Sequence, residues 1–453
     1  MQLRTYEKGQ AMSIAELNTL LFTIGSMLWG WPLIGFVLAS GLVISVACNW
    51  IQFRYFAAAW RYVFYPESSS GEMISPLQAF LNTLSASIGN GSLTGMATAI
   101  YSGGPGAAFW VFVLGFFTMP IRFAEVYAGT HNAVREKNGT LRGGPLAYIQ
   151  LVPGGNLLVY VYVVFCLLLT FVGGNAMQCQ AVTKGLTTML PVSAYAVAAI
   201  LFGFIVYVML GGAQRVLKVS DMIVPIKVGL FFVSMVIALV FHYNSLIPAL
   251  QLMIQGAFTP EALGGGLLGY TVQDAIRFSM ARTLNATEAG IGTAGILYGG
   301  TGTKDHMRSG IMAMATSFIS NHLVCFNIMW LIVASGAWQS GVNGTGLTIL
   351  AYESVFGALG GWVVTILSAM FGLGVLIAYA YIGRECWSFL TGGRYFGLYT
   401  AIYCSMALVG SLAEISLVWN SIDIAIAGLV IINLYALLFL LPKIRKAVVS
   451  YDK

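Results

Sequence analysis

The chain has 453 residues, of which 58% are hydrophobic and 8% are charged, with a net charge of +6. Soluble domains carry about 25% charged residues, so this composition excludes a soluble globular protein and predicts an all-α polytopic membrane protein. The positive charge needs no nucleic-acid partner, and the six cysteines lie in or beside apolar segments, which indicates packing residues rather than a disulfide framework.

The first apolar stretch, from Leu17 to Cys48, is too long for the core of a signal peptide and shows no convincing cleavage site. We expect a retained membrane helix, with Met12 as an alternative start because the charges before it belong to no evident element. The stretch that follows, NWIQFRYFAAAWRYVFY, mixes aromatic residues with Arg54 and Arg61. That mixture predicts a helix lying at the membrane interface.

Windows of the length of a spanning helix identify eleven apolar segments. They cover approximately residues 17–46, 77–102, 106–130, 157–181, 192–212, 221–242, 266–299, 309–336, 360–391, 396–417 and 422–442. Alternate loops carry 17 and 3 Lys or Arg residues, with Lys227 among the 17, and basic residues accumulate on the cytoplasmic side. We predict a multi-pass protein of the cell (inner) membrane, with its N-terminus outside and its C-terminus in the cytoplasm.

Two of these segments contain related polar stretches, SIGNGSLTGMATAIYSGGPG and TLNATEAGIGTAGILYGGTG. Asn90 and Asn285 begin matching triplets 195 residues apart. Five spans separate the stretches, so the second copy runs in the opposite sense, which predicts an inverted repeat of five plus five helices. Residues 71–245 and 246–453 would form the two repeats, and residues 1–70 would add an N-terminal span and the interfacial helix.

Each repeat is expected to begin with a discontinuous helix. Secondary transporters use such breaks to hold a polar solute at the membrane midplane, because broken helices offer free amides and carbonyls. Close helix packing through small residues is the alternative.

Other polar residues lie inside the predicted spans. Gln178 is expected either to bond to a neighbouring helix or to face a solute. Arg122 and Glu125, three residues apart near the inner end of their span, are expected to form a structural pair, with a gate as the alternative. Glu288 has no cation at such a spacing, and it is either a functional carboxylate or a cap of the interrupted helix.

The remaining polar residues fit no enzyme motif. The chain has no H-E-x-x-H, no G-x-S-x-G, no phosphate loop and no metal-site spacing, so an enzyme is not predicted. A channel is a second alternative, although no selectivity-filter loop or symmetric charge ring is visible. In the eighth segment, Ser320, Asn321 and His322 form a polar cluster, whose histidine could carry protons or could simply hydrogen-bond.

The motifs SIGNGSLTGMATAIYSGGPGAAFW, FAEVYAG, GGPLAYI, GGNAMQ and EAGIGTAG resemble, in this order, the alanine or glycine:cation symporter family, the sodium–alanine symporters. The resemblance covers nearly the whole chain and is most specific at the first break. It implies a fold like that of the bacterial leucine transporter, and a symporter of a small neutral amino acid such as alanine or glycine. No cofactor is implied beyond Na⁺ or H⁺ as the coupling ion.

The chain departs from the family in several side chains, which suggests a divergent member with a different substrate or coupling ion. The family's Gly-Thr-Gly-Asn is here Gly89-Asn90-Gly91-Ser92, and its Phe-Ser-Asn before Glu-Ala-Gly is Asn285-Ala286-Thr287. In segment nine its Ser-Thr and its Trp are replaced by Gly374, Val375 and Tyr379, in segment eight its Asp-Thr pair is replaced by Ser320-Asn321, and Gln178 matches.

The resemblance implies a solute-binding site between the two breaks. The solute carboxylate would rest on amides around Gly91 and Ser92, beside Asn90, where a half-helix begins. Its ammonium would meet carbonyls near Asn285. Gln178 would add a hydrogen bond and Tyr379 would close the pocket.

The resemblance also places a sodium ion beside the first break, held by carbonyls around Ser85 and Ile88 and by hydroxyls of segment nine. Gly374 and Val375 offer no side-chain oxygen there, so sodium binding should weaken unless water or Ser368 fills the gap. Sodium coupling, proton coupling and facilitated diffusion all stay open. The further candidates for ion coupling are Ser368, Asp274, Glu288, Ser320, Asn321 and His322.

Overall fold

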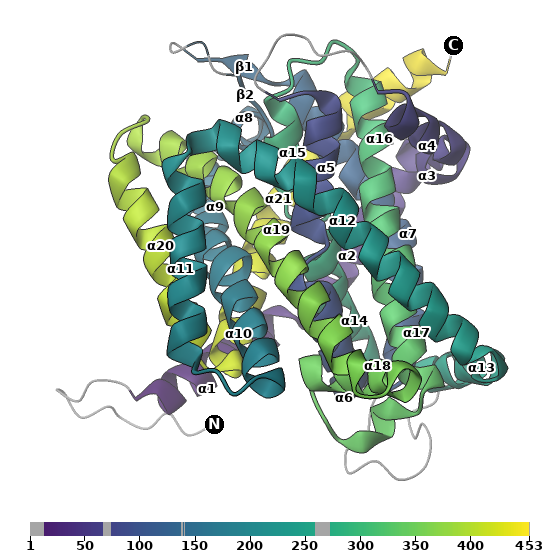
Figure 1. Ribbon diagram of the computed structural model, residues 1–453. Helices are drawn as coiled ribbons and strands as arrows, with labels where there is room; N and C mark the ends of the chain where they lie inside the picture. The colour runs from purple at the N-terminus through teal and green to yellow at the C-terminus, as the bar shows by residue number, and fades with distance from the viewer. Residues whose placement is uncertain (1–12, 67–73, 137–138, 140, 259–271, 453) are drawn as a thin grey trace, which may run out of the picture.

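The computed structural model describes residues 13–66, 74–136, 139, 141–258 and 272–452, and most of this part of the chain is helical (Figure 1). Met12, the predicted boundary at residues 70 and 71, and the predicted start of segment seven at 266–271 lie outside the described residues.

The elements follow one another along the chain with one short hairpin between them. Up to residue 258 they are α1 (Ile14–Leu28), α2 (Trp31–Ala47), α3 (Ile51–Arg54), α4 (Phe56–Phe64), α5 (Pro76–Ser87), η1 (Gly91–Gly95), α6 (Met96–Gly103), α7 (Gly106–His131), β1 (Val134–Arg135), β2 (Leu141–Arg142), α8 (Pro145–Tyr148), η2 (Ile149–Leu151), α9 (Gly155–Phe171), η3 (Val172–Ala176), α10 (Met177–Met189), α11 (Ala194–Leu210), α12 (Gly212–Phe241) and α13 (Tyr243–Phe258). From residue 272 they are α14 (Val272–Thr287), α15 (Thr293–Gly299), α16 (His306–Phe318), η4 (Ile319–Cys325), α17 (Phe326–Ala334), η5 (Ala337–Ser340), α18 (Thr345–Phe356), α19 (Leu359–Thr391), α20 (Phe396–Leu412) and α21 (Ile415–Tyr451). Strands β1 and β2 pair antiparallel, with Val134 opposite Arg142.

By length and hydropathy, six helical segments of the described chain can each cross a membrane, and the bent pair α1–α2 can make a seventh. The chain is therefore a multi-pass membrane protein, while the count of eleven spans stays a prediction. The first segment was expected to be one helix, and this is wrong, because α1 and α2 meet at 48°. The bend lies at Gly30, with Pro32 in the first turn of α2, where a proline cannot continue the preceding helix. Helices α13 and α18 lie in predicted loops.

Both stretches that the sequence predicts to be discontinuous leave the α-helix. Helix α5 ends at Ser87, and the chain resumes as the π-helical turn η1. Helix α14 ends at Thr287, and α15 begins at Thr293. In this second break Glu288, Gly290 and Gly292 have φ of 56°, 90° and 94°, a left-handed backbone that glycine adopts without strain. We call residues 88–90 the first break and residues 288–292 the second break.

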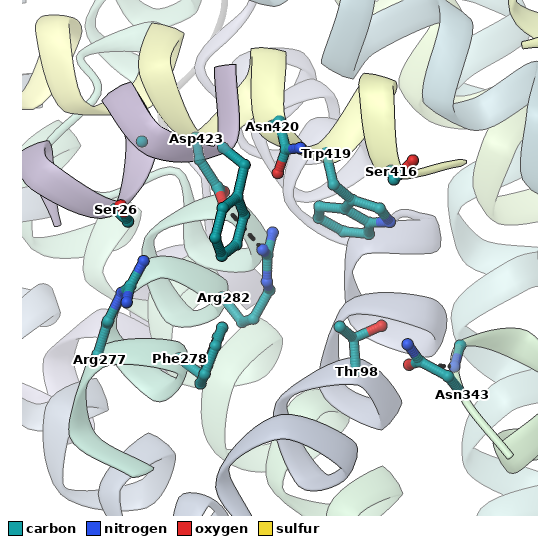
Figure 2. Close-up of a pocket in the computed structure, with 13 residues that line it drawn as sticks. Ser26, Thr98, Arg277, Phe278, Arg282, Asn343, Ser416, Trp419, Asn420 and Asp423 are labelled. Carbon is teal, nitrogen blue, oxygen red and sulfur yellow. Dashed lines mark hydrogen bonds and ion pairs between the residues drawn. The ribbon is translucent and has the colours of Figure 1, made fainter. Parts of the chain in front are cut away.

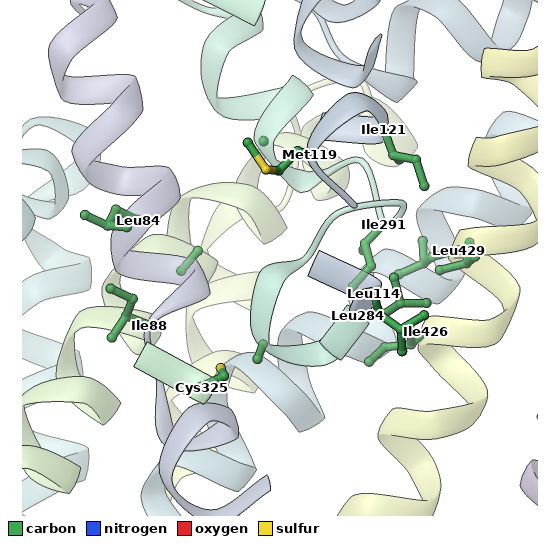
Figure 3. Packing of buried hydrophobic residues seen from close by; sticks show 14 of the residues in the cluster. Leu84, Ile88, Leu114, Met119, Ile121, Leu284, Ile291, Cys325, Ile426 and Leu429 are labelled. Carbon is green, nitrogen blue, oxygen red and sulfur yellow. The ribbon is translucent and has the colours of Figure 1, made fainter. Parts of the chain in front are cut away.

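The two breaks lie in the middle of the packed helices. Helix α7 packs against α14, α15 and α16, whereas α12 packs against α5 and α19, and α11 pairs with α20 at one side (Figure 1). Figure 3 shows apolar side chains from α5, α7, α14 and α21 around the breaks. Those that are fully buried or nearly so include Leu84, Ile88, Leu114, Ile121, Leu284, Ile291, Ile426 and Leu429.

Helices α7 and α15 approach the GGPLAYI stretch at glycines. A Cβ on Gly129 would lie 3.0 Å from the Cα atoms of Gly144 and Gly295, and a Cβ on Gly299 would overlap the backbone of Gly143. Small residues allow such close contact between helices inside a membrane. These contacts hold α15, and with it the second break, against α7.

We expect Gly299→Ala to destabilise the protein by about 1–3 kcal/mol, because its methyl group meets backbone that cannot rotate away. Gly203→Ala in α11 is the matched control, since a Cβ there has nothing within 4 Å. The measurement is thermal unfolding of both variants in detergent. Equal midpoints for the two would contradict the packing argument.

Candidate functional site

A small cavity lies between the two breaks, and we call it the break cavity. Its volume is about 20 Å³, which is room for about one water molecule. It is lined by Ala86, Ser87, Gly89, Gly91, Leu169, Gly173, Met177, Gln178, Asn285, Glu288, Val375 and Tyr379. The structure thus brings together four of the six predicted solute-binding residues, Gly91, Gln178, Asn285 and Tyr379, which come from η1, α10, α14 and α19.

The side chains of the first break are already engaged with one another. Gln178 Oε1 accepts hydrogen bonds from the backbone amide of Asn90 at 3.1 Å and from its side-chain amide at 3.2 Å. The Ser368 hydroxyl donates to Asn90 Oδ1 at 2.7 Å. Asn90 therefore fixes the break between α10 and α19, and Ser368, a predicted ion ligand, is committed to Asn90.

The amide of Ser92 is also in use. It donates to the carbonyl of Gly89 at 2.9 Å, and Ser92 does not line the break cavity. In this conformation the Ser92 amide is thus occupied within the turn, and its predicted contact with a solute carboxylate stays a prediction. Gly91 does line the cavity, and a Cβ there would overlap Asn285 Oδ1.

The second break is held by a buried ion pair from α7. Arg122 and Glu125 lie 3.5 Å apart and are fully buried. Arg122 donates to the carbonyl of Thr287, the last residue of α14, and Glu125 accepts from the amide of Gly290 at 2.7 Å. Asn433 of α21 donates to Glu125 at 2.8 Å. The pair is structural, as the spacing suggests, and it provides partners for backbone groups that the break exposes.

Glu288 lies on the cavity side of the second break. Its carboxylate accepts a hydrogen bond from the Thr293 hydroxyl at 2.7 Å and one from the Tyr379 hydroxyl. Both Glu288 and Tyr379 line the cavity. Glu288 therefore stabilises the start of α15 and also borders the break cavity, while its role toward a solute stays a prediction.

The polar cluster of segment eight lies within the π-helical turn η4, and its members have different partners. Ser320 donates to Ala286 O at 2.8 Å and to Ser87 O at 3.3 Å, so one hydroxyl joins both interrupted helices. Asn321 donates to Val111 O at 2.7 Å. His322 packs among Phe112, Phe116 and Phe318, with ring centroids 4.5–5.1 Å apart. Neither Asn321 nor His322 lines the break cavity.

Lys227 is the site residue that the sequence analysis misplaced. The charge count assigned it to a cytoplasmic loop, but the structure buries it completely on α12. Its ammonium donates to Ile88 O at 2.8 Å and to Ser85 O at 3.0 Å. The signal was present, because a single lysine in DMIVPIKVGLFFVSM is a charge inside an apolar helix, which marks a functional position. Arg122, in the same count, is buried as well.

A second, larger pocket of about 280 Å³ lies beside α1, α6, α14 and α21, and we call it the vestibule (Figure 2). Arg282 and Asp423 form an ion pair at 3.0 Å there, and the Arg282 guanidinium lies 4.1 Å from the centre of the Trp419 ring. The side chains of Arg277, Asn343, Ser416 and Asn420 also line it.

Only about one helical turn separates the vestibule from the break cavity. On α14, Arg282 lines the vestibule and Asn285, three residues later, lines the cavity. On η1, a Cβ at Gly95 would lie 3.2 Å from Trp419, whereas Gly91 lines the cavity. Since one helical turn rises about 5.4 Å, Arg282 lines the vestibule and also lies close to the break cavity along α14.

Comparison with known proteins gives a consistent result. Residues 14–453 match the sodium:alanine symporter family. The sodium/alanine symporter AgcS of Methanococcus maripaludis is 28% identical over 94% of this chain and 95% of its own length. An uncharacterized transporter of Haemophilus influenzae is 29% identical over 96% of each chain, and the amino-acid carrier protein AlsT of Bacillus subtilis is 27% identical over 96% and 92%.

Among solved structures, the chain resembles the substrate-bound outward-open state of a Na⁺-coupled sialic acid symporter. The TM-score is 0.52 at 12% identity, over 89% of this chain and 79% of that one. At this identity the likeness concerns the fold alone.

We expect Arg122→Met to destabilise the protein by about 3–5 kcal/mol, because it leaves Glu125 buried without its cation and Thr287 O without its donor. Arg54→Met is the matched control, since the Arg54–Asp452 pair is exposed and such pairs contribute about 0–1 kcal/mol. Thermal unfolding in detergent compares the two. If Arg122→Met unfolds no earlier than Arg54→Met, the ion pair does not hold the break.

Proposed function

Because the chain belongs to the sodium:alanine symporter family, a family of transporters and not of enzymes, we propose that it carries a small amino acid such as alanine or glycine across the cell (inner) membrane. It would do so by alternating access, with the solute held in an enlarged break cavity between two inverted five-helix repeats. The observation that carries this proposal is that Gly91, Gln178, Asn285 and Tyr379, all predicted to bind the solute, line one small cavity with polar and apolar walls.

The chemistry of the break cavity suits a zwitterion. Gly91 stands at the start of the half-helix η1–α6, where the positive end of the helix dipole attracts a carboxylate. Glu288 and the Asn285 amide oxygen lie at the other break, where they attract an ammonium group. Leu169, Met177 and Val375 form an apolar wall. We propose that the amino acid spans the two breaks in this orientation, with its side chain against that wall.

The conformation described here is closed around the cavity. A space for one water molecule cannot hold an amino acid, so binding requires the interrupted helices to separate. We propose that the vestibule is the outer entrance and that Arg282, Asp423 and Trp419 open first, since they line it and Arg282 lies one helical turn from Asn285 of the break cavity. A cation would move with the amino acid. Sodium is the ion in the family's name, and a proton gradient or uncoupled diffusion is the alternative.

We expect Gly91→Ala to reduce the affinity for L-alanine about tenfold or more, a loss of about 1.4 kcal/mol, because its methyl group takes the space between Gly91 and Asn285. The fold should survive, since the Asn285 side chain can rotate. Gly35→Ala in α2 is the control, because a Cβ there has nothing within 4 Å. Binding is read as the thermal shift with L-alanine, within a screen of amino acids that also identifies better ligands.

Uptake of L-[¹⁴C]alanine into proteoliposomes gives the second readout for these two variants. Equal binding and uptake by Gly91→Ala and Gly35→Ala would place the solute elsewhere. Single-channel currents from the wild type would support a channel and refute alternating access.

The proposed orientation predicts labelling from opposite sides of the membrane. Asn343→Cys, at the vestibule, should react with a membrane-impermeant maleimide added outside, and Arg394→Cys, exposed before α20, should react only from the cytoplasm. The six native cysteines are all buried and free, and replacing them removes the background. Labelling of Asn343→Cys from the cytoplasm alone would invert the orientation.

A further inference from the structure

Lys227 closes a shell of backbone carbonyls at the first break. Helix α5 ends there, so the carbonyls of Ser85 and Ile88 have lost their partners within the helix. Both accept hydrogen bonds from the Lys227 ammonium, and the Ser85 hydroxyl oxygen lies 3.5 Å from it. The negative end of the α5 dipole favours a positive charge at this point. A single charge thus satisfies backbone groups that neither lipid nor water reaches.

The same ammonium also contacts the facing helix, α19. Its nitrogen lies 5.7 Å from the centre of the Phe371 ring, on the side where a cation is attracted to the aromatic face. A Cβ on Gly374 would lie 2.6 Å from the Lys227 nitrogen and 2.8 Å from Ser85 Oγ. A serine or threonine at position 374 therefore has no room while the lysine is present. The glycine at position 374 of α19 and the lysine at position 227 of α12 therefore depend on each other, because the lysine occupies the space that a side chain at position 374 would need.

This position is the one in which the family resemblance implies sodium, between the carbonyls of Ser85 and Ile88 and the hydroxyls of segment nine. Sodium does not fit here beside the lysine, because the carbonyls are engaged and Gly374 and Val375 supply no oxygen from a side chain. Two monovalent cations a few ångströms apart in a buried site would also repel each other strongly. The negative charge of Glu288 favours the charged form of Lys227 electrostatically.

We propose that the ammonium of Lys227 is a built-in cation that replaces sodium at the first break, so that this transporter binds and carries its amino acid without sodium. The lysine joins α5 to α12 and α19 permanently, whereas a sodium ion would join α5 to α19 only while bound. The proposal rests on the proposed function for the part that concerns transport, but the occupation of the carbonyl shell can be tested without any amino acid.

The first experiment measures cation binding to the purified full-length protein. Its thermal unfolding is followed while sodium chloride replaces choline chloride at constant ionic strength. The wild type should unfold at the same temperature in both salts. The double variant Lys227→Ala/Gly374→Thr vacates the shell and adds a hydroxyl, so sodium should raise its midpoint by about 2 °C or more. A saturable stabilisation of the wild type by sodium would overturn the proposal.

The second experiment uses Lys227→Met, which keeps the aliphatic stem and removes the charge. It should lower the unfolding temperature and abolish the thermal shift produced by L-alanine, whereas Lys184→Met, at an exposed position of α10, should change neither. Unchanged stability of Lys227→Met would refute the inference, since the carbonyls would then need no ammonium. This arm holds even if the double variant does not fold.

The third experiment separates this inference from the proposed function. Wild-type proteoliposomes should accumulate or equilibrate L-alanine equally well in sodium and choline buffers. Uptake that requires sodium would refute the inference about Lys227 but would support the proposed function as an amino-acid transporter. No uptake of any amino acid, together with a salt-independent unfolding temperature, would refute the proposed function while the lysine keeps its place as the cation.

Discussion

The backbone of the two interrupted helices is the constraint on which the rest of this structure depends. Each break exposes amides and carbonyls in a region where lipid offers no hydrogen-bond partner, and each exposed group must be satisfied from within the protein. At the second break, Arg122 donates to one exposed carbonyl and Glu125 accepts from one exposed amide. At the first, Lys227 meets two carbonyls and Gln178 meets an amide. The backbone groups exposed at the breaks therefore explain why charged residues are buried on α7 and α12.

The two breaks are joined as well as satisfied. The Ser320 hydroxyl bonds to carbonyls on both interrupted helices, and the Ser87 hydroxyl lies 3.3 Å from the carbonyl of Thr287. Ser320 lies on the π-helical turn η4, and the further π-helical turns η1 and η3 line the break cavity or lie next to Gln178. Such turns displace one residue from the regular helix and often occur at functional positions. The break cavity is thus bordered both by the helix breaks and by π-helical turns.

The two spaces differ in what closes them. The break cavity is closed by groups that are fully buried and bonded, whereas the vestibule is closed from it by one ion pair and the Trp419 ring. The side chains of Arg282 and Asp423 are 5% and 17% exposed, so this ion pair is largely buried. Lys227, on α12, bonds to the carbonyls of Ser85 on α5 and Ile88 at the first break, and not to η1.

The amino-acid sequence by itself determined that this is a helical membrane protein, where its helices are interrupted, and which residues border the interruptions. Composition and the length of the apolar segments predict the helical membrane protein, because an α-helix satisfies its own backbone hydrogen bonds in lipid. The glycines around Asn90, and Gly290 and Gly292 after Asn285, predict the interruptions, because such residues combined with polar side chains favour a break in a spanning helix. The bend at Gly30 and the helices α13 and α18 were missed, since short or amphipathic helices leave a weak apolar signal.

Only the tertiary structure decided how the polar groups pair. Sequence spacing relates residues a turn apart, so it could link Arg122 to Glu125, but it carries no information about contacts between helices distant in the chain. Lys227 reaches Ser85 across 142 residues, and Asn90 reaches Ser368 across 278. A count of charges by loop placed Lys227 at the membrane surface because hydropathy measures the cost of burying a lysine and not the carbonyls that meet it. Those carbonyls become available only where α5 breaks against α12 and α19, and that is a property of the folded chain.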